Sequence, residues 1–398
     1  MRTDTIAVHS GRDDLGAIGV HVPPIDLSTT YPFTDLDQAT ASYDSMAAGG
    51  APIGSALYAR LHNPTVARFE EALAALEGLD EAVAFSSGMA AITALLLAVR
   101  ERGSHVVALR PLYGGTDHLL ASGMLGLEAT FTTPDQVRAA IRPDTALVIM
   151  ESPGNPTLAL MDIADVVAQA GSVPVVVDST FATPVLQQPG RQGATFVLHS
   201  ATKFLGGHGD VIAGVIATSS AWALKIRQVR VLTGALLHPL GGYLLHRGLQ
   251  TLPVRVRAQQ AGAMEIARRL QDHPNVLGVH YPGLPGADPH GLVGRQMSGP
   301  GSILAFRVRG GHEGCRRVLG NLRTITSALS LGSVDSLIEH PAGLTHRIMD
   351  PEVKALAGIT DDLLRLSVGL EDPADLVEDL FQALESAVAV PDGEMATV

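Results

Sequence analysis

Short apolar runs that alternate with helical or loop segments place the strongest limit on how this chain folds. Each run is continuously apolar instead of alternating with polar residues, which is typical of strands buried on both faces of a sheet. The runs cover residues 82–85, 105–109, 146–150, 173–177, 196–198 and 211–216. We therefore predict an α/β fold with a mainly parallel sheet enclosed by helices.

A length of 398 residues exceeds what one hydrophobic core usually organises, so we predict more than one domain. Frequent Pro, Gly, Ser and Thr predict an extended N-terminal arm over residues 1–55. A helical stretch at 244–267 leads away from the sheet, and further apolar runs alternate with helices after it. The predicted division is the arm, a larger domain at 56–245 and a smaller C-terminal α/β domain at 246–398.

Composition favours a soluble, cytoplasmic protein that forms oligomers. Apolar residues make up 46% of the chain and charged residues only 17%, which indicates that surface is withdrawn into subunit contacts. No apolar stretch reaches the roughly 18 residues of a membrane span, and residues 1–4 do not begin a secretory signal. The net charge is −12 and no basic stripe occurs. We expect neither a membrane nor a nucleic acid as a partner.

The cysteine and histidine residues give no sign of a metal site. The single cysteine, Cys315, excludes a thiolate cage and an internal disulfide, and we expect it to fill the core. The histidines form no HExxH or HxxxH pattern that would place two ligands on one helix face. No metal is predicted.

One of only three lysines, Lys203, ends a run of polar residues that follows a predicted strand. A neutral lysine amine is nucleophilic, and the hydroxyls of Ser200 and Thr202 can hold an anionic group beside it. Pyridoxal phosphate (PLP), a carbonyl cofactor that carries a phosphate, needs both features. The structural alternative is a lysine at a strand end among ordinary hydroxyl residues. We interpret the other two lysines, Lys225 and Lys354, as surface charges.

An aspartate ends another predicted strand before Lys203. Asp178 follows the apolar run at 175–177, so its carboxylate emerges at the carboxyl end of a strand, where ligands of such sheets bind. A carboxylate there can keep a pyridine nitrogen protonated and make the ring an electron sink. The alternative is a turn or helix N-cap aspartate, because Ser179 and Thr180 follow.

Further candidates follow two other predicted strands. Ser87, Gly88 and Met89 lie at the start of a helix, where backbone N–H groups can cradle a phosphate, although many helices begin with Ser-Gly. Tyr113 can stack on a flat cofactor and move protons through its hydroxyl. A loop tyrosine that caps the core is the alternative for Tyr113.

Two arginines are candidates for binding anions. Tyr58 and Arg60 lie next to the predicted arm and can both reach a phosphate, and if the arm belongs to a partner subunit the site is shared. Arg365 lies within an apolar strand pattern and needs a carboxylate, which an amino-acid substrate would supply. A structural salt bridge is the alternative for Arg365.

Taken together, these residues resemble the Cys/Met-metabolism family of PLP-dependent enzymes, which have fold type I. The resemblance extends from about residue 5 to residue 387. Its motifs lie at residues 58–65, 86–89, 113–115, 151–156, 177–180, 200–203 and 365–369. It implies a mainly parallel seven-stranded sheet in the larger domain, PLP as cofactor, and a homotetramer built from two dimers that share their active sites.

The resemblance also implies a role for each candidate residue. Lys203 would bind PLP as a Schiff base and remove the substrate's α-proton, Asp178 would pair with the ring nitrogen, and Tyr113 would stack on the ring and protonate the departing sulfur. The phosphate would be held by Ser87, Gly88, Met89, Ser200, Thr202, and Tyr58 and Arg60 of the partner subunit. The substrate would be bound by Arg365, Asn155, Ser330, Leu329 and Tyr58.

The implied reaction is γ-elimination on a sulfur amino acid, which yields a thiol, 2-oxobutanoate and ammonia. Cystathionine-cleaving members typically carry a glutamate where this chain has Leu329, so we place methionine or homocysteine ahead of cystathionine. Two differences argue against methionine as the substrate. Enzymes of this family that cleave methionine usually carry a cysteine where this chain has Gly115, and a Lys-Asp pair where it has Arg230-Val231. Alternatives are γ-replacement on an acylated homoserine and a cofactor-binding protein without catalysis.

Overall fold

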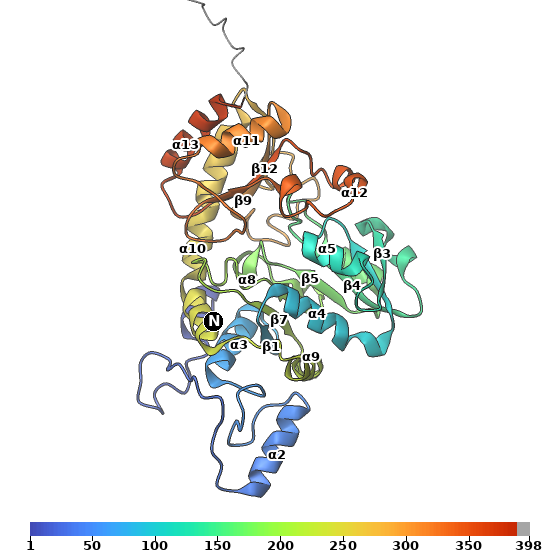
Figure 1. Ribbon diagram of the computed structural model, residues 1–398, viewed down its shortest axis with the longest axis vertical. Coiled ribbons are helices and arrows are strands. Elements are labelled where there is room, and N and C mark those ends of the chain that lie inside the picture. Colours follow the sequence, from blue (N-terminus) through green and yellow to red (C-terminus); the bar gives the residue numbers. More distant parts are fainter. Residues whose placement is uncertain (388–398) are drawn as a thin grey trace, which may run out of the picture.

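The computed structural model describes residues 1–387 and contains two sheets joined by one long helix (Figure 1). Residues 388–398, which the sequence assigns to the C-terminal domain, lie outside the described residues. The larger sheet has seven strands in the order β1-β7-β6-β5-β4-β2-β3. Its strands are β1 (Glu81–Phe85), β2 (His105–Leu109), β3 (Glu128–Thr132), β4 (Thr145–Glu151), β5 (Val175–Asp178), β6 (Phe196–His199) and β7 (Gly214–Thr218).

The predicted seven-stranded, mainly parallel sheet is confirmed. Strand β7 runs antiparallel to both of its neighbours, whereas the other adjacent strands pair in parallel. The apolar runs missed β3, because this edge strand is partly exposed and mixes polar with apolar residues. The run at 211–216 becomes a strand only from Gly214, since residues 211–213 form a loop beside the cavity described below.

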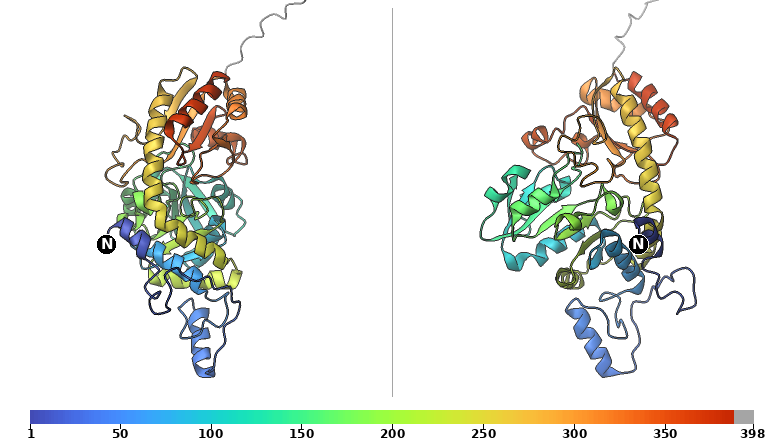
Figure 2. Two further views of the ribbon diagram at one scale, coloured as in Figure 1. Left: turned by 90° about the vertical axis from the view of Figure 1, so that its left-hand side faces the viewer. Right: turned by 180° about the vertical axis from the view of Figure 1, so that it is seen from behind.

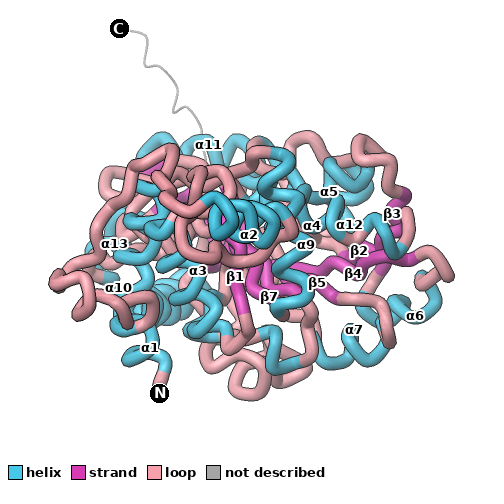
Figure 3. Tube along the Cα trace, turned by 90° about the horizontal axis from the view of Figure 1, so that it is seen from below, coloured by secondary structure: helices cyan, strands magenta, loops and turns pink. Residues whose placement is uncertain are grey.

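Helices cover both faces of the larger sheet, with α4 and α9 on one side and α7 on the other in Figure 3. Because successive strand residues point to opposite faces, Val83 and Phe85 pack with α4 and α9, whereas Ala82 and Ala84 join the core under α3 and α10. The α-helices from residue 1 to the end of the long helix that joins the two sheets are α1 (Thr3–His9), α2 (Leu36–Ala47), α3 (Pro64–Glu77), α4 (Gly88–Ala98), α5 (Gly114–Ala121), α6 (Val137–Ala140), α7 (Ile163–Ala170), α8 (Thr183–Leu186), α9 (Ser220–Thr233) and α10 (Pro239–Gln271).

The boundaries of α3 follow from its sequence. Asn63 is the N-cap, and its side chain accepts hydrogen bonds from the N–H groups of Thr65 and Val66. Pro64 occupies the first turn, where its missing N–H costs nothing, and Gly78 ends the helix at φ 68°. Replacing an N-cap of this kind by alanine typically costs about 1 kcal/mol.

The N-terminal segment differs from the predicted extended arm, because it contains two helices. Helix α1 packs against α10 and α3, whereas α2 projects away from the body of the chain (Figures 1 and 2). Asp35 caps α2 by accepting from the N–H of Gln38. The dense Pro and Gly residues on both sides of α2 concealed its helical sequence. None of the helices in residues 1–387 combines the length and apolar character needed to cross a membrane.

The smaller sheet follows α10 and has the order β10-β11-β12-β9-β8. Helices α10, α11 and α13 cover one face of it, and Cys315 is buried in this core as predicted. The elements are β8 (Val276–His280), β9 (Ile303–Val308), α11 (Gly311–Asn321), β10 (Thr326–Ser327), β11 (Leu337–Glu339), α12 (Pro351–Leu356), β12 (Leu363–Ser367) and α13 (Pro373–Glu385). The 3-10 turns found within residues 1–387 are η1 (Arg100–Arg102), η2 (Pro134–Gln136), η3 (Pro189–Gln192) and η4 (Pro341–Gly343).

Helix α10 has 33 residues and runs alongside both sheets (Figure 2). The buried guanidinium of Arg255 donates to the carbonyl of Phe204 at 2.8 Å. One turn further, the amide of Gln259 donates to the carbonyl of Ser333 at 2.7 Å. One face of this helix therefore holds two loops, one from the larger sheet and one that precedes β11.

Candidate active site

A cavity of about 310 Å³ lies at the carboxyl ends of the strands of the larger sheet. Residues from both sheets line it, and they include most of the side chains that the sequence singled out. The predicted residues that line the cavity are Ser87, Gly88, Met89, Tyr113, Asn155, Asp178, Ser200, Thr202, Lys203, Leu329, Ser330 and Arg365. Tyr58 and Arg60 do not line it within the same chain.

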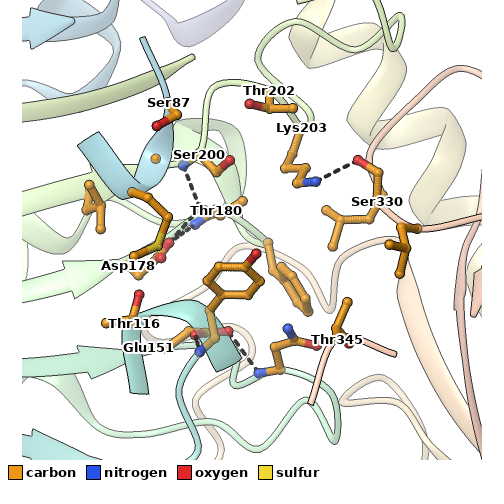
Figure 4. A pocket seen from close by; sticks show the side chains of 18 of the residues that line it. Ser87, Thr116, Glu151, Asp178, Thr180, Ser200, Thr202, Lys203, Ser330 and Thr345 are labelled. Carbon is orange, nitrogen blue, oxygen red and sulfur yellow. Dashed lines mark hydrogen bonds between the residues drawn. The ribbon is translucent and has the colours of Figure 1, made fainter. Parts of the chain in front are cut away.

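Lys203 projects into this cavity from the loop after β6 and faces Ser330 (Figure 4). Its Nζ donates to Ser330 Oγ at 2.6 Å. Burial, assisted by the nearby positive charge of Arg365, lowers the pKa of Lys203 to about 8. Ser330 has a φ of 97°, a left-handed conformation that a side chain rarely adopts. The amine is therefore partly neutral near neutral pH and is held by a strained residue of the opposite wall.

Asp178 ends β5 at the inner side of the cavity. Its Oδ1 accepts from the N–H of Thr180 at 3.0 Å and from Thr180 Oγ1 at 2.5 Å. The same hydroxyl accepts from the N–H of Ser200 at 2.8 Å. Burial raises the pKa of Asp178, and the two bonds from Thr180 oppose that rise. Asp178 thus forms the turn that was the structural alternative for this residue, and the same turn directs its carboxylate toward the cavity.

The start of α4 provides unpaired backbone donors. Ser87 is the N-cap, and its Oγ accepts from the N–H of Ala90 at 3.0 Å. Within residues 1–387, no protein group accepts a hydrogen bond from the N–H of Gly88 or Met89. A Cβ at Gly88 would lie 3.2 Å from Ser200 Cβ, so glycine keeps this corner open. An anion can therefore approach the helix start closely.

Thr202 fixes the loop that carries Lys203. Its Oγ1 donates to the carbonyl of Ala213 at 3.1 Å and accepts from the N–H of Ala213 at 3.0 Å. These bonds join the Lys203 loop to residues 211–213, which is why the predicted strand at 211–216 begins late. The hydroxyl proton of Thr202 is engaged with the protein, a use that the sequence did not predict.

Glu151 is a cavity residue to which the sequence assigned no role. It ends β4 directly beside Asp178 of β5. Its two oxygens accept from the N–H groups of Tyr113 at 2.7 Å and Asn155 at 2.9 Å (Figure 4). Burial and the neighbouring Asp178 carboxylate raise the pKa of Glu151. The signal was available, because Glu151 ends a continuous apolar run in the same way as Asp178.

Arg365 on β12 forms the structural salt bridge that the sequence left as one alternative, and it also lines the cavity. The salt bridge is a buried ion pair with Glu339 of β11, with 2.7 Å between Nη2 and Oε1. Nη1 donates to Asn155 Oδ1 at 2.8 Å, and Nη2 donates to the carbonyl of Ser330 at 3.1 Å. Sequence reasoning missed Glu339 and also Thr345, whose Oγ1 donates to Glu339 Oε1 at 2.9 Å.

The residues expected to distinguish substrates lie in different places. Leu329 is 55% exposed at the cavity, where Ile212 is 71% exposed. Gly115 lies under the Tyr113 ring, where an added Cβ would be 2.7 Å from Tyr113 Cε1. Arg230, by contrast, is buried away from the cavity of its own chain and pairs with Glu70 at 2.5 Å.

Tyr58 and Arg60 lie together near α9, outside the cavity of their own chain. The Arg60 guanidinium carbon is 5.5 Å from the centroid of the Tyr58 ring, and Nη1 donates to the carbonyl of Val231 at 2.9 Å. Val231 therefore contacts Arg60 and, like its neighbour Arg230, does not line the cavity of its own chain.

The remaining residues singled out by the sequence lie elsewhere. Lys225 is on the surface and pairs with Glu101 at 2.8 Å. Lys354 lies on the short helix α12. Among the residues that the structure describes, no group of three or more His, Cys, Asp or Glu side chains is arranged to hold a metal ion.

Comparison with known proteins decides the family. The sequence model of the family described as Cys/Met metabolism PLP-dependent enzymes matches residues 4–385. The chain belongs to this family. Two L-methionine gamma-lyases are each 56% identical to it: that of Brevibacterium sandarakinum, over 98% of this chain and 99% of the relative, and that of Streptomyces avermitilis, over 96% and 88%.

Solved structures of other family members share the fold. A cystathionine gamma-lyase from Micromonospora echinospora is 42% identical, with a TM-score of 0.88 over 97% of this chain and 99% of that one. A cystathionine gamma synthase from Xanthomonas oryzae is 36% identical, with a TM-score of 0.88 over 97% and 98%. The family member described here therefore has fold type I and is a PLP-dependent enzyme.

The groups around the cavity fit PLP. The free N–H groups of Gly88 and Met89, with the Ser200 hydroxyl beside them, suit a phosphate. Asp178 offers a buried carboxylate for a ring nitrogen. Lys203 offers an amine whose lowered pKa favours the nucleophilic neutral form. These three kinds of group surround one cavity, so a single cofactor molecule can contact all of them.

Proposed function

We propose that this enzyme is a carbon–sulfur lyase that cleaves methionine or homocysteine by γ-elimination, giving a thiol, 2-oxobutanoate and ammonia. The observation that carries the proposal is the 56% identity to L-methionine gamma-lyases over nearly the whole chain. Cytoplasmic location remains a prediction from the sequence.

The polarity of the cavity rim supports methionine over cystathionine. Leu329 and Ile212 present apolar side chains to the cavity, and they suit a methylthio group. Cystathionine carries a second amine and carboxylate at its far end. Leu329 replaces the glutamate that could pair with that amine, so this position offers no charge to these groups.

We assign the following roles to the residues of the cavity. PLP, when bound, supplies an anchor for the substrate amine and an electron sink for charge that develops at Cα. Arg365 and Asn155 hold the α-carboxylate. Lys203 takes the α-proton as a general base, and its pKa of about 8 suits that task near neutral pH. Asp178 keeps the pyridine nitrogen protonated, and the Tyr113 hydroxyl protonates the departing sulfur.

A substrate assay tests the proposal directly. The purified enzyme is expected to form 2-oxobutanoate from methionine and homocysteine without any added thiol. The kcat/KM for cystathionine should be at least about tenfold lower than that for methionine, because the distal charges of cystathionine must be desolvated against an apolar rim. The measurement is 2-oxobutanoate release at matched concentrations of the three substrates.

The assay also examines a second function, γ-replacement. The structural similarity to a cystathionine gamma synthase gives this alternative its support. O-acyl-homoserine is therefore included with and without a thiol acceptor. Product that forms only when the thiol is present would overturn the lyase proposal and favour the transferase.

We propose that the chain is divided into an arm at 1–55, a PLP-binding domain at 56–245 and a C-terminal domain from 246 onward. We further propose that two copies share their active sites, with Tyr58 and Arg60 entering the cavity of the partner, and that two such dimers form a tetramer. The exposure of Leu27 (63%), Phe33 (54%) and Leu36 (70%) on the arm supports this, since a second copy would cover them.

Complementation between two inactive variants tests the shared site. Arg60→Ala and Lys203→Ala should each be inactive alone. In a hybrid dimer, one site receives both the intact Arg60 and the intact Lys203. Random coexpression is therefore expected to recover about a quarter of wild-type activity per chain in the unselected mixture, because about half of the dimers are hybrids and one of their two sites is intact. A hybrid that stays as inactive as its parents would contradict sharing between subunits.

A further inference from the structure

We infer that Glu339 weakens the binding of the substrate α-carboxylate to this enzyme, because its negative charge partly neutralises the positive charge of Arg365. The inference rests on the proposed function only in taking the substrate to be an α-amino acid. Glu339 is a positioning residue in this role, because it acts through Arg365.

The two residues are built as a pair. Glu339 on β11 and Arg365 on β12 are direct partners in the antiparallel register of the smaller sheet. Glu339 is 1% exposed and Arg365 is 2% exposed, and their ion pair measures 2.7 Å. Thr345 adds a hydrogen bond to Glu339 Oε1. Side chains fixed by neighbouring strands and by burial have little freedom to separate when a ligand arrives.

The pair leaves hydrogen-bonding capacity unused. Within residues 1–387, Arg365 Nε and Glu339 Oε2 are both buried without a hydrogen-bond partner. A guanidinium has five N–H donors, and Arg365 directs its Nη groups to Glu339, Ser330 and Asn155. The remaining donors can take a carboxylate, but the positive charge that attracts it is already countered by Glu339.

Glu339 therefore has two opposite effects. A buried arginine without a counter-charge is strongly destabilising, so Glu339 makes the empty site tolerable. Once the substrate is bound, two carboxylates share one guanidinium, and their mutual repulsion in a partly buried site is substantial. The α-carboxylate is thus bound more weakly than Arg365 alone would allow.

The test uses Glu339→Gln, which removes the charge and keeps an oxygen that can accept from Arg365 and Thr345. The probes are 4-(methylthio)butanoate and 4-(methylthio)butanamide, which lack the amine and differ only in the carboxylate. Their Kd values are measured by calorimetry on the PLP-loaded enzyme. In E339Q the carboxylate should bind about tenfold more tightly, whereas the amide should be unaffected.

A matched control is Glu352→Gln, which removes the same charge from an exposed position on α12. It should leave both Kd values unchanged. Unchanged or weaker binding of the carboxylate by E339Q, with the amide still bound normally, would overturn the inference. A general loss of packing would change the Kd values of both probes together, and that result would also count against the inference.

A second variant keeps the test available if E339Q does not fold. Glu339→Asp retains the charge but withdraws it from Arg365 by one methylene, so its carboxylate Kd should lie between those of wild type and E339Q. Weaker binding of the carboxylate alone by E339D would contradict the inference. Because the probes do not react, these results are independent of whether the enzyme is a lyase or a transferase.

Discussion

Replacing Lys203 by alanine is expected to lower turnover by at least about 10⁴-fold, because we propose that this one side chain supplies both the covalent attachment for PLP and the base that takes the α-proton. The neighbouring groups cannot replace it. Ser330 Oγ, 2.6 Å from the amine, is a far weaker base. The variant should also lose the absorbance near about 420 nm that borohydride removes from the wild-type enzyme. The measurements are 2-oxobutanoate release and the absorption spectrum.

Lys225→Ala is the matched control for this variant. Lys225 lies on the surface of α9 and pairs with Glu101, so its loss should leave both activity and spectrum unchanged. A K203A enzyme within tenfold of wild-type turnover would end the proposed assignment of the base and of the PLP attachment point.

Asp178→Asn is expected to give the second largest loss, about 10²- to 10³-fold in kcat. Asparagine keeps the size of the side chain and an oxygen that can accept from Thr180, so the turn after β5 should persist. It cannot balance a positive charge on the pyridine nitrogen, and the ring would then accept electrons poorly. The rate is measured alongside the PLP content of the denatured protein, which separates slow chemistry from loss of cofactor.

The control for D178N is Asp165→Asn, an exposed aspartate of α7 that lies outside the cavity. Its rate should match wild type. If D178N retains full PLP content and full rate, the ring nitrogen does not depend on this carboxylate, and the proposed electron sink must be supported by another group.

The sequence predicted those parts of the fold that depend on local patterns. Continuous apolar runs marked the buried strands of the larger sheet. It failed where burial is incomplete, as at β3, or where turn residues surround a helix, as at α2. Edge strands and exposed helices lack the apolar pattern on which such predictions depend.

The candidate site was predictable where a residue follows a strand or begins a helix. Lys203 and Asp178 were found in this way, and Glu151 had the same signal. Glu339 was not found, because its importance arises from a contact with Arg365 that only pairing of β11 with β12 creates. Thr345 was not found, because it acts through its hydrogen bond to Glu339. Long-range pairing of this kind leaves no mark on the local sequence.

The long helix α10 determines how the cavity can change its width. Arg255 holds the carbonyl next to Lys203, and Gln259 holds the loop that carries Ser330. The two residues are one helical turn apart, about 6 Å along the axis, and a helix interior does not stretch. The spacing between the base and the opposite wall is therefore a constant of the molecule. Differences in substrate size must be accommodated at the rim, where Leu329 and Ile212 are exposed and not packed in a core.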